Sequence, residues 1–228
     1  MAAQLSVIIP TLNEAGCIGQ LLRQLQALRA EGHELILVDG GSGDETVALA
    51  AGLVDQLLSA PAGRARQMNV GAQAARGRWL WFLHADSQLP DRAWHRVIEA
   101  LQPAGGWGRF DVRLSGDRPL LRLVEQLMNW RSRLTGMATG DQGVFVTRAL
   151  FEKIGGFAEL PLMEDIDLSR RLKRVQRPKC LRETLTTSSR RWEQRGVLRT
   201  IVLMWALRLA FFFGVSPARL ATRYDQRA

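Results

Sequence analysis

Cysteine is almost absent from the 228-residue chain, which contains only Cys17 and Cys180. Because these two residues form no CxxC pair, the sequence excludes a disulfide-stapled scaffold and a zinc site of the usual spacing. The sequence also predicts no secretory leader, since the short apolar run of residues 5–9 ends at Pro10 and no basic segment precedes it. These features predict a cytoplasmic protein.

The common nucleotide-binding signatures are missing as well. Neither GxGxxG nor GxxxxGK followed by Ser or Thr occurs after the first or second predicted strand. This excludes the dinucleotide-binding fingerprint and the P-loop, whose glycines bring backbone amides against phosphates. Any nucleotide must therefore be bound in another way.

A long uninterrupted apolar run is lacking too. Residues 197–215 are apolar except for Arg199, Thr200 and Arg208, which makes them a poor transmembrane candidate. At about 100° per residue the two arginines lie on opposite sides of a helix, so no clean polar stripe exists. The apolar surface of such a helix must be buried against something. We expect that protein, including a second copy of the chain, covers it rather than membrane headgroups.

Lysine is rare, although the formal net charge is +9 and the isoelectric point is about 11.0. The excess is almost entirely arginine, which binds phosphate bidentately. A field of this sign attracts phosphates, anionic lipids and nucleic acid alike, and an arginine-rich genome would produce the same excess. The charge by itself therefore selects no partner.

What the sequence does contain is an alternation of strands and helices. Strands are predicted at residues 5–9, 34–39 and 79–83, with helices between them, which favours a mostly parallel α/β sheet flanked by helices. After Pro103 the pattern becomes α+β, with strands at 109–114 and 144–147 and a helix at 119–134. No linker separates the parts, so we predict one domain, 1–228, composed of residues 1–102, 103–196 and an apolar helical segment at 197–228.

Polar clusters follow each predicted strand, where ligands collect in open parallel sheets. After the first strand, Asn13 can cap the next helix, with Glu14 in its first turn. After the second, Asp39 stands among glycines that allow a ligand close to the backbone, and it suits the donors of a base or ribose. Further donors precede the third strand: Arg64, Arg66, Gln67 and Asn69.

His84-Ala85-Asp86 follows the third strand. Residues i and i+2 of an extended chain project to one side, which places the imidazole and the carboxylate together. A hard divalent ion needs only one or two carboxylates in addition to phosphate oxygens and water. The alternative is an ordinary polar turn after a strand.

Glu164 and Asp165 are adjacent carboxylates before an arginine-rich helical stretch at residues 168–175. Acids at a helix start commonly interact with the helix dipole. The functional alternative is a general base that accepts a proton from an acceptor hydroxyl.

Taken in order, these blocks resemble the family 2 glycosyltransferases: residues 10–14 (PTLNE), 38–44 (VDGGSGD), 66–71 (RQMNVG), 84–86 (HAD) and 164–165 (ED). The resemblance covers about residues 5–170, and within the family the chain is similar to a small bacterial subgroup of uncertain substrate. It implies a GT-A fold, with residues 1–102 as the nucleotide-binding half and 103–196 as the acceptor-binding half. It also implies an inverting transfer from a nucleotide-sugar donor.

The resemblance assigns roles to individual positions. Asp86, the last acid of a DxD-like motif, would bind Mg or Mn, and Asp165 would be the base, with Glu164 beside it. The nucleotide-sugar would be bound by Pro10, Thr11, Asn13, Glu14, Asp39, Gly41, Ser42, Arg64, Gln67, Asn69 and His84. The acceptor side would include Asp141, Gln142 and Trp192. Two positions depart from the family's pattern, since His84 replaces the usual first acid of the motif and Gly40 replaces a second acid after Asp39.

Two other functions stay open at this point. A nucleotidyltransferase also acts on phosphates at an α/β sheet, but it should carry a Gly-rich loop and a lysine after the first strand. A non-catalytic basic module for nucleic acid or anionic membrane is the second alternative. No repeat of interleaved aromatic and basic residues is present, so we predict no nucleic-acid partner. The sequence does not identify the acceptor. The apolar carboxyl-terminal segment and the basic charge leave a lipid-linked acceptor at the inner face of the membrane as a minor hypothesis, and a homodimer through that segment is the other.

Overall fold

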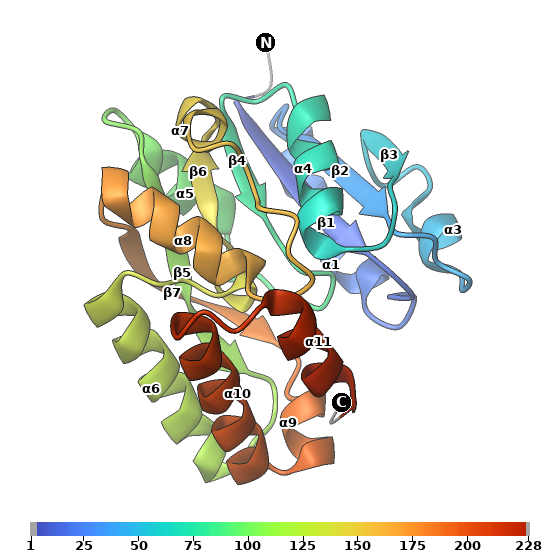
Figure 1. The fold of residues 1–228 in the computed structure, drawn as a ribbon. Coiled ribbons are helices and arrows are strands. Elements are labelled where there is room, and N and C mark those ends of the chain that lie inside the picture. The colour runs from blue at the N-terminus through green and yellow to red at the C-terminus, as the bar shows by residue number, and fades with distance from the viewer. Residues whose placement is uncertain (1–3, 227–228) are drawn as a thin grey trace.

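A seven-stranded sheet forms the centre of the computed structural model, which describes residues 4–226 (Figure 1). The strand order is β3-β2-β1-β4-β6-β5-β7, and β6 runs antiparallel to both of its neighbours while the other pairs are parallel. The strands are β1 (Leu5–Thr11), β2 (Glu34–Asp39), β3 (Gln56–Ser59), β4 (Trp79–Phe82), β5 (Trp107–Leu114), β6 (Phe145–Thr147) and β7 (Lys179–Thr187). The predicted mostly parallel α/β sheet is confirmed.

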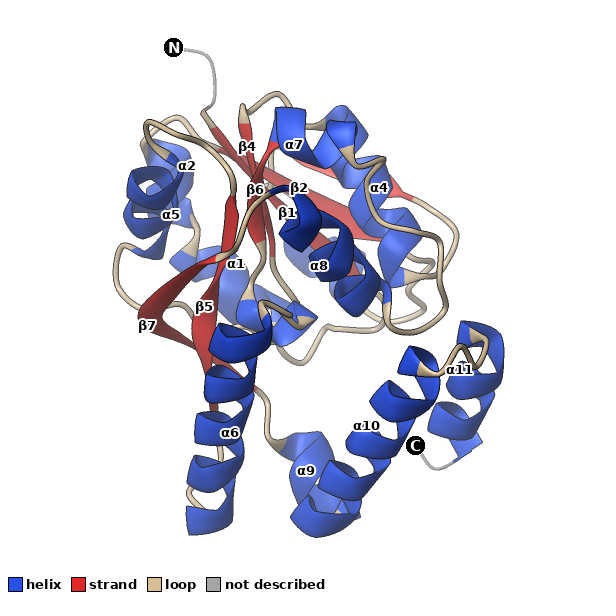
Figure 2. Ribbon diagram, turned by 60° about the vertical axis from the view of Figure 1, so that its left-hand side comes forward, coloured by secondary structure: helices blue, strands red, loops and turns tan. Residues whose placement is uncertain are grey.

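Helices cover both faces of this sheet (Figure 2). One face packs against α1 (Ile18–Gln24), α2 (Gln26–Ala30), α3 (Thr46–Ala50) and α5 (Ala93–Leu101). The other packs against α4 (Arg64–Ala74), α7 (Arg148–Lys153) and α8 (Glu164–Val175). Along β1 the side chains alternate between the two cores, as the period of a strand requires: Val7 and Ile9 enter the first, and Ile8 enters the second.

The remaining helices lie beyond the β5 and β7 end of the sheet (Figure 1), and α6 and α10 stand apart along most of their length in the view of Figure 2. They are α6 (Pro119–Thr135), α9 (Arg190–Arg195), α10 (Val197–Phe212) and α11 (Pro217–Gln226). A small core of Leu121, Val124 and Val197 joins α6 to the start of α10. A second core joins α10 to α11 through Leu207 and Leu220.

The predicted apolar helix is thus covered on one side only. Its outer face exposes Leu198, Val202, Trp205, Leu209 and Phe212, and α6 likewise exposes Leu123, Leu127, Trp130 and Leu134. We call these two rows of side chains the apolar ridge. Within residues 4–226 no helix has the length and hydropathy that crossing a bilayer requires.

Several predicted boundaries were wrong. The first strand does not end at Pro10 but continues to Thr11, because β4 pairs with β1 only as far as Ile8 and needs no amide hydrogen from Pro10. Strands β3 and β7 were not predicted. Asn13 does not cap the next helix and Glu14 is not in its first turn, since α1 begins at Ile18.

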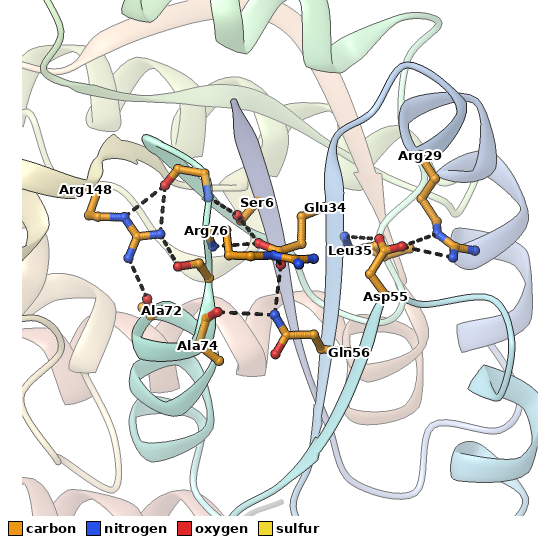
Figure 3. A network of polar contacts seen from close by, with 12 residues as sticks. Ser6, Arg29, Glu34, Leu35, Asp55, Gln56, Ala72, Ala74, Arg76 and Arg148 are labelled. Atoms are coloured by element: carbon orange, nitrogen blue, oxygen red, sulfur yellow. Dashed lines mark hydrogen bonds and ion pairs between the residues drawn. The ribbon is translucent and has the colours of Figure 1, made fainter. Parts of the chain in front are cut away.

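A polar network occupies the amino ends of the strands, opposite the edge where ligands are expected (Figure 3). The buried carboxylate of Glu34 accepts hydrogen bonds from the Ser6 hydroxyl at 2.6 Å, the Gln56 amide at 2.8 Å, and the backbone N–H and Nε of Arg76, both at 2.7 Å. Arg148 donates to the carbonyls of Ala72, Ala75 and Gly77 at the end of α4. At this edge the charged groups of Glu34 and Arg148 therefore have hydrogen-bond partners within the protein.

Candidate active site

A cavity of about 380 Å³ opens at the carboxyl edge of the sheet. The loop after β1, the loop after β4, the end of β7, the start of α8 and one side of α10 line it. A short 3-10 helix (Gly140–Gln142) forms another wall. The polar side chains on these walls include Glu14, Arg64, His84, Asp86, Asp141, Glu164, Asp165, Arg190 and Arg208. Segments far apart in the sequence therefore bring acids and arginines together in one cavity.

Asp86 follows β4 and lines this cavity. Its Oδ2 accepts hydrogen bonds from the Thr187 hydroxyl at 3.2 Å and the Ser188 backbone N–H at 3.3 Å, which ties the loop to the end of β7. Both bonds use Oδ2, so Oδ1 is available as a ligand. Among residues 4–226 no three His, Cys, Asp or Glu side chains converge on one point. A divalent ion here would therefore depend on oxygens from a bound ligand and water.

His84 lines the same cavity as Asp86, and its Nδ1 is 3.3 Å from Oδ1 of Asp141. The imidazole packs directly on the backbone of Gly140, where an added Cβ would stand 2.4 Å from Nε2. Only glycine allows this approach. Gly140 therefore sets the position of the imidazole, a role that the sequence analysis did not identify.

Asp165 and Glu164 begin α8 at the wall of the cavity. The Gly140 N–H donates to Oδ2 of Asp165 at 3.0 Å, and the Ile166 N–H donates to Oδ1 at 2.7 Å. These bonds fix the carboxylate in orientation. Burial raises the pKa of Glu164, and the Asp165 carboxylate raises it further, whereas the Arg64 charge opposes the shift.

Two arginines that the sequence analysis did not assign to the site stand close to these acids. Arg208 of α10 lines the cavity, and Arg131 of α6 lies beyond it, in a neighbouring groove between the two helices. Burial and the neighbouring Arg208 charge lower the pKa of Arg131 to about 10, against the opposing effect of Asp165. The only sequence signal was the presence of Arg208 in an otherwise apolar helix.

The loop after β2 is organised around Asp39. Its Oδ2 accepts the N–H groups of Gly41 at 2.9 Å and Ser42 at 2.8 Å, and its Oδ1 accepts the hydroxyls of Ser42 at 2.5 Å and Thr11 at 3.3 Å. Burial opposes ionisation, but these hydrogen bonds outweigh it and hold the pKa of Asp39 below its ordinary value. Asn13 joins the same loop, since its Oδ1 accepts the Gly43 N–H at 2.8 Å and its own N–H donates to Ser42.

Three amide side chains of the predicted site form hydrogen bonds with backbone groups of the protein. Gln67 donates to the carbonyls of Thr11 at 2.7 Å and Val38 at 2.8 Å. Asn69 exchanges two hydrogen bonds with the backbone of Phe157, at 2.8 and 2.9 Å. The buried Gln142 accepts the Thr139 N–H at 3.1 Å. In the structure these amides hold the loops that surround the cavity.

The cavity thus gathers one part of the predicted site and leaves another part outside. It is lined by Pro10, Glu14, Arg64, His84, Asp86, Asp141, Glu164, Asp165 and Trp192. The other predicted residues lie behind or beside it: Thr11, Asn13, Asp39, Gly41, Ser42, Gln67, Asn69 and Gln142.

This arrangement of acids and arginines at the edge of a mostly parallel sheet can be compared with known proteins. The sequence profile described as Glycosyl transferase family 2 matches residues 6–146, which include β1, β2, β4 and the loops that hold Asp39 and Asp86. The chain belongs to glycosyl transferase family 2. The resemblance inferred from the ordered blocks is thereby confirmed.

Relatives in this family come from several bacteria. An uncharacterized glycosyltransferase of Mycobacterium tuberculosis is 34% identical over 169 residues, which are 68% of this chain and 63% of that protein. A PGL/p-HBAD biosynthesis glycosyltransferase of Mycobacterium bovis is 39% identical over 95 residues, 39% of this chain and 37% of that protein. The matched regions therefore span less than two thirds of the length of either relative.

Solved structures share the fold at low identity. S. aureus TarS 1-349 superposes with a TM-score of 0.68 at 18% identity, covering 82% of this chain and 60% of that one. Glucosyl-3-phosphoglycerate synthase of Mycobacterium tuberculosis, solved with Mn2+, uridine diphosphate and glucosyl-3-phosphoglycerate, gives a TM-score of 0.60 at 18% identity, over 81% of this chain and 71% of that one. The family 2 chain described here thus has the GT-A fold.

Proposed function

We propose that this chain is a metal-dependent glycosyltransferase that moves a sugar from a nucleotide-sugar to an acceptor hydroxyl with inversion. The observation that carries the proposal is the convergence of Asp86, Arg64 and Asp165 on one cavity at the carboxyl edge of the sheet. Such a transfer needs three groups: a carboxylate that binds a cation, a guanidinium that binds phosphate and a second carboxylate that accepts a proton. Asp86, Arg64 and Asp165 would supply them in this order.

The proposed reaction is a direct displacement at the anomeric carbon. The acceptor oxygen forms a bond to that carbon while the bond to the donor diphosphate breaks, and the acceptor proton passes to Asp165. The nucleoside diphosphate leaves with the bonding electron pair. Backbone amides of Gly140 and Ile166 hold the Asp165 carboxylate in place, so that the chain contributes chiefly positioning and electrostatic stabilisation.

Mg or Mn would be held by Asp86 together with the donor diphosphate. When bound, the ion offsets the negative charge that develops on the leaving diphosphate. The available Oδ1 of Asp86 fits this role, and the lack of a converging set of acids in the described residues fits an ion that binds together with the donor. Arg64 and His84, which line the same cavity, would contact the phosphates or the sugar.

The nucleotide would lie toward the loops after β1 and β2, beside the network of Asp39. Two solved relatives support a nucleoside diphosphate donor, because TarS 1-349 was solved with UDP-GlcNAc and the synthase with UDP and Mn2+. In this chain the four hydrogen bonds to Asp39 fix the shape of the loop that contains Gly41 and Ser42. We propose that this preformed loop, together with Asn13 and Thr11, contacts the base and ribose, while Gln67 and Asn69 support it from behind.

A thermal-shift screen with nucleoside diphosphates and their sugars, with and without Mn, tests the proposal. The melting temperature should rise for one base, and chelation should abolish the rise. Asp86→Ala should remove the metal-dependent part of donor binding in calorimetry, while Asp91→Ala, an exposed acid farther along the same loop, should bind as wild type does. Unchanged metal-dependent binding by Asp86→Ala would place the site elsewhere.

The sequence pattern alone favours a protein cover for the carboxyl-terminal helix, but the chain itself leaves the apolar ridge exposed. We further propose that this ridge contacts the inner face of a membrane. The ridge exposes Trp130, Trp205 and Phe212 on helices that extend away from the body, and the chain carries a net charge of +9. Amphipathic helices rich in arginine and large apolar side chains bind anionic headgroup regions. The protein should float with phosphatidylglycerol vesicles and not with phosphatidylcholine vesicles. A stable dimer that does not float would show that a second copy covers the ridge instead.

A further inference from the structure

Two half-buried arginines stand at the point where the main cavity meets an apolar groove. The groove, about 80 Å³ in volume, runs between α6 and α10, and Val124, Leu127, Ile201 and Trp205 are among its lining residues. The groove and the cavity adjoin, because they share the lining residues Asp141, Trp192, Met204 and Arg208. Arg131 lines the groove on the α6 side.

Both guanidinium groups contain donors that the protein does not satisfy. Nη2 of Arg131 and Nε of Arg208 are shielded from solvent and have no hydrogen-bond partner among residues 4–226. An unsatisfied buried donor is costly, and more so on a charged group. By contrast, Arg148 on the opposite edge of the sheet donates four hydrogen bonds to backbone carbonyls.

The two charges also repel one another. Burial is the main cause that lowers the pKa of Arg131, and the charge of Arg208 is the second. Burial lowers the pKa of Arg208 as well, and Asp165 and Asp141 offset this in part. A pair of like charges with free donors is stabilised by an anion that binds both.

We propose that Arg131 and Arg208 bind an anionic group of the acceptor, a phosphate or a carboxylate, while an apolar chain of the same acceptor lies in the groove between α6 and α10. This inference rests on the proposed transfer, because it assumes that Asp165 accepts the proton of the acceptor hydroxyl. Arg208 and Asp165 line the same cavity, so an anion held by Arg208 brings the rest of the acceptor into the space that the proposed base lines. The acceptor is therefore an anionic amphiphile.

The apolar groove distinguishes this ligand from a free anion. Inorganic phosphate satisfies the arginines and leaves the groove empty, whereas a neutral amphiphile fills the groove and leaves the arginines unsatisfied. Trp205, which is 61% exposed in the unliganded chain, gains apolar contact only with a ligand that has a chain. Both parts of the site must be occupied for full affinity.

Titrations with three probes below their micelle concentrations test the proposal: decyl phosphate, decyl maltoside and inorganic phosphate. Binding is followed by calorimetry and by tryptophan emission. Decyl phosphate should bind about tenfold or more tightly than either of the others, since hydrogen bonds to a charged group distinguish ligands on that scale. Equal affinity for decyl phosphate and decyl maltoside would overturn the proposal, and this comparison requires no variant.

Substitutions locate the site. Arg208→Gln and Arg131→Gln should each reduce the preference for decyl phosphate over decyl maltoside by about tenfold. Arg199→Gln, an exposed arginine of the same helix α10, is the matched control and should keep the preference. If all three variants keep it, the anion is bound elsewhere and the proposal fails. Circular dichroism on each variant checks that the helices are formed.

A competition separates this inference from the proposed function. UDP with Mn should leave the affinity for decyl phosphate unchanged, because the arginines belong to the acceptor. If UDP displaces decyl phosphate, the arginines bind the donor and the inference fails while donor binding stands. Absence of any thermal shift with nucleoside diphosphates would instead count against the proposed function, whatever the amphiphiles do.

Discussion

Each edge of the sheet contains a buried glutamate, and the surroundings shift the pKa values of the two glutamates in opposite directions. At the amino edge, Glu34 is buried among donors that satisfy both of its oxygens, and hydrogen bonds outweigh burial to hold its pKa below the ordinary value. At the carboxyl edge, Glu164 is buried beside another acid, and its pKa is raised. The two edges therefore treat a buried acid differently: hydrogen bonds favour the charged form of Glu34, whereas burial and a neighbouring acid disfavour the charged form of Glu164.

The largest expected effect is the loss of transfer in Asp165→Asn. An amide cannot accept the acceptor proton, and general-base catalysis contributes about 10²- to 10⁴-fold, so the rate should fall by about 10³-fold. The rate is measured at saturating donor, and Asp91→Asn, on an exposed loop, is the control. Near-normal transfer by Asp165→Asn would remove its role as the base.

The next effect belongs to the amino edge and concerns stability. Glu34→Ala leaves the donors of Ser6, Gln56 and Arg76 without their acceptor, which should cost about 3 kcal/mol in the free energy of unfolding. Urea denaturation measures this loss, and transfer at low temperature should persist. Glu99→Ala removes an exposed ion pair with Arg96 and should change stability by less than about 1 kcal/mol. Equal losses of unfolding free energy in the two variants would show that the hydrogen-bond network at the amino edge does not stabilise the fold.

The two buried glutamates should also respond to pH with opposite sign. The ordinary value is 4.5 for both, and the folded pKa lies below it for Glu34 and above it for Glu164. Glu34 therefore stabilises the fold above pH 4.5, and this contribution is lost as the pH falls through its folded pKa. The contribution of Glu164 is present below pH 4.5 and is lost as the pH rises through its folded pKa.

Melting temperatures of the glutamine variants between pH 3 and pH 7 check these signs. The melting temperature of Glu34→Gln should fall further below that of wild type as the pH rises. The melting temperature of Glu164→Gln should increase relative to that of wild type over the same range, because the substitution removes a carboxyl group that must ionise in a buried place. Parallel curves for the two variants would show that the environments are alike.

The smallest effect concerns Gly140. In Gly140→Ala the new Cβ would meet the imidazole of His84, which must rotate away from Asp141. Transfer should fall by about tenfold through misplacement of a group in the cavity, with little change in melting temperature. Gly16→Ala, where an added Cβ meets nothing within 4 Å, is the control. A Gly140→Ala enzyme with wild-type turnover would show that the position of His84 is not critical.

Much of the fold could be predicted because apolar runs identify buried strands. Residues 79–83 read as a strand covered on both faces, and β4 is buried throughout. By contrast, β7 escaped prediction because most of its residues are polar and only partly buried. The short edge strand β3 lacks a clear run as well.

The places of two acids could be predicted from the sequence. Asp86 was expected from its position after a strand and Asp165 from the resemblance to the family, and both line the cavity. Asn69 and Gln142 show the limit of this reasoning, since a sequence does not tell whether an amide binds a ligand or a backbone group. Arg131 and Arg208 come together only through the packing of α6 beside α10, which no local pattern encodes.

The central strand β6 has a consequence for protein engineering. It follows α6 in the chain, yet it is inserted between β4 and β5 and pairs with both. A cut near Pro103 would therefore not release two modules, but would expose the edge of β4 with the buried Trp79 and Trp81. Chimeras that exchange acceptor specificity should keep β6 with the first half of the chain and graft only α6 and the segment that follows β7.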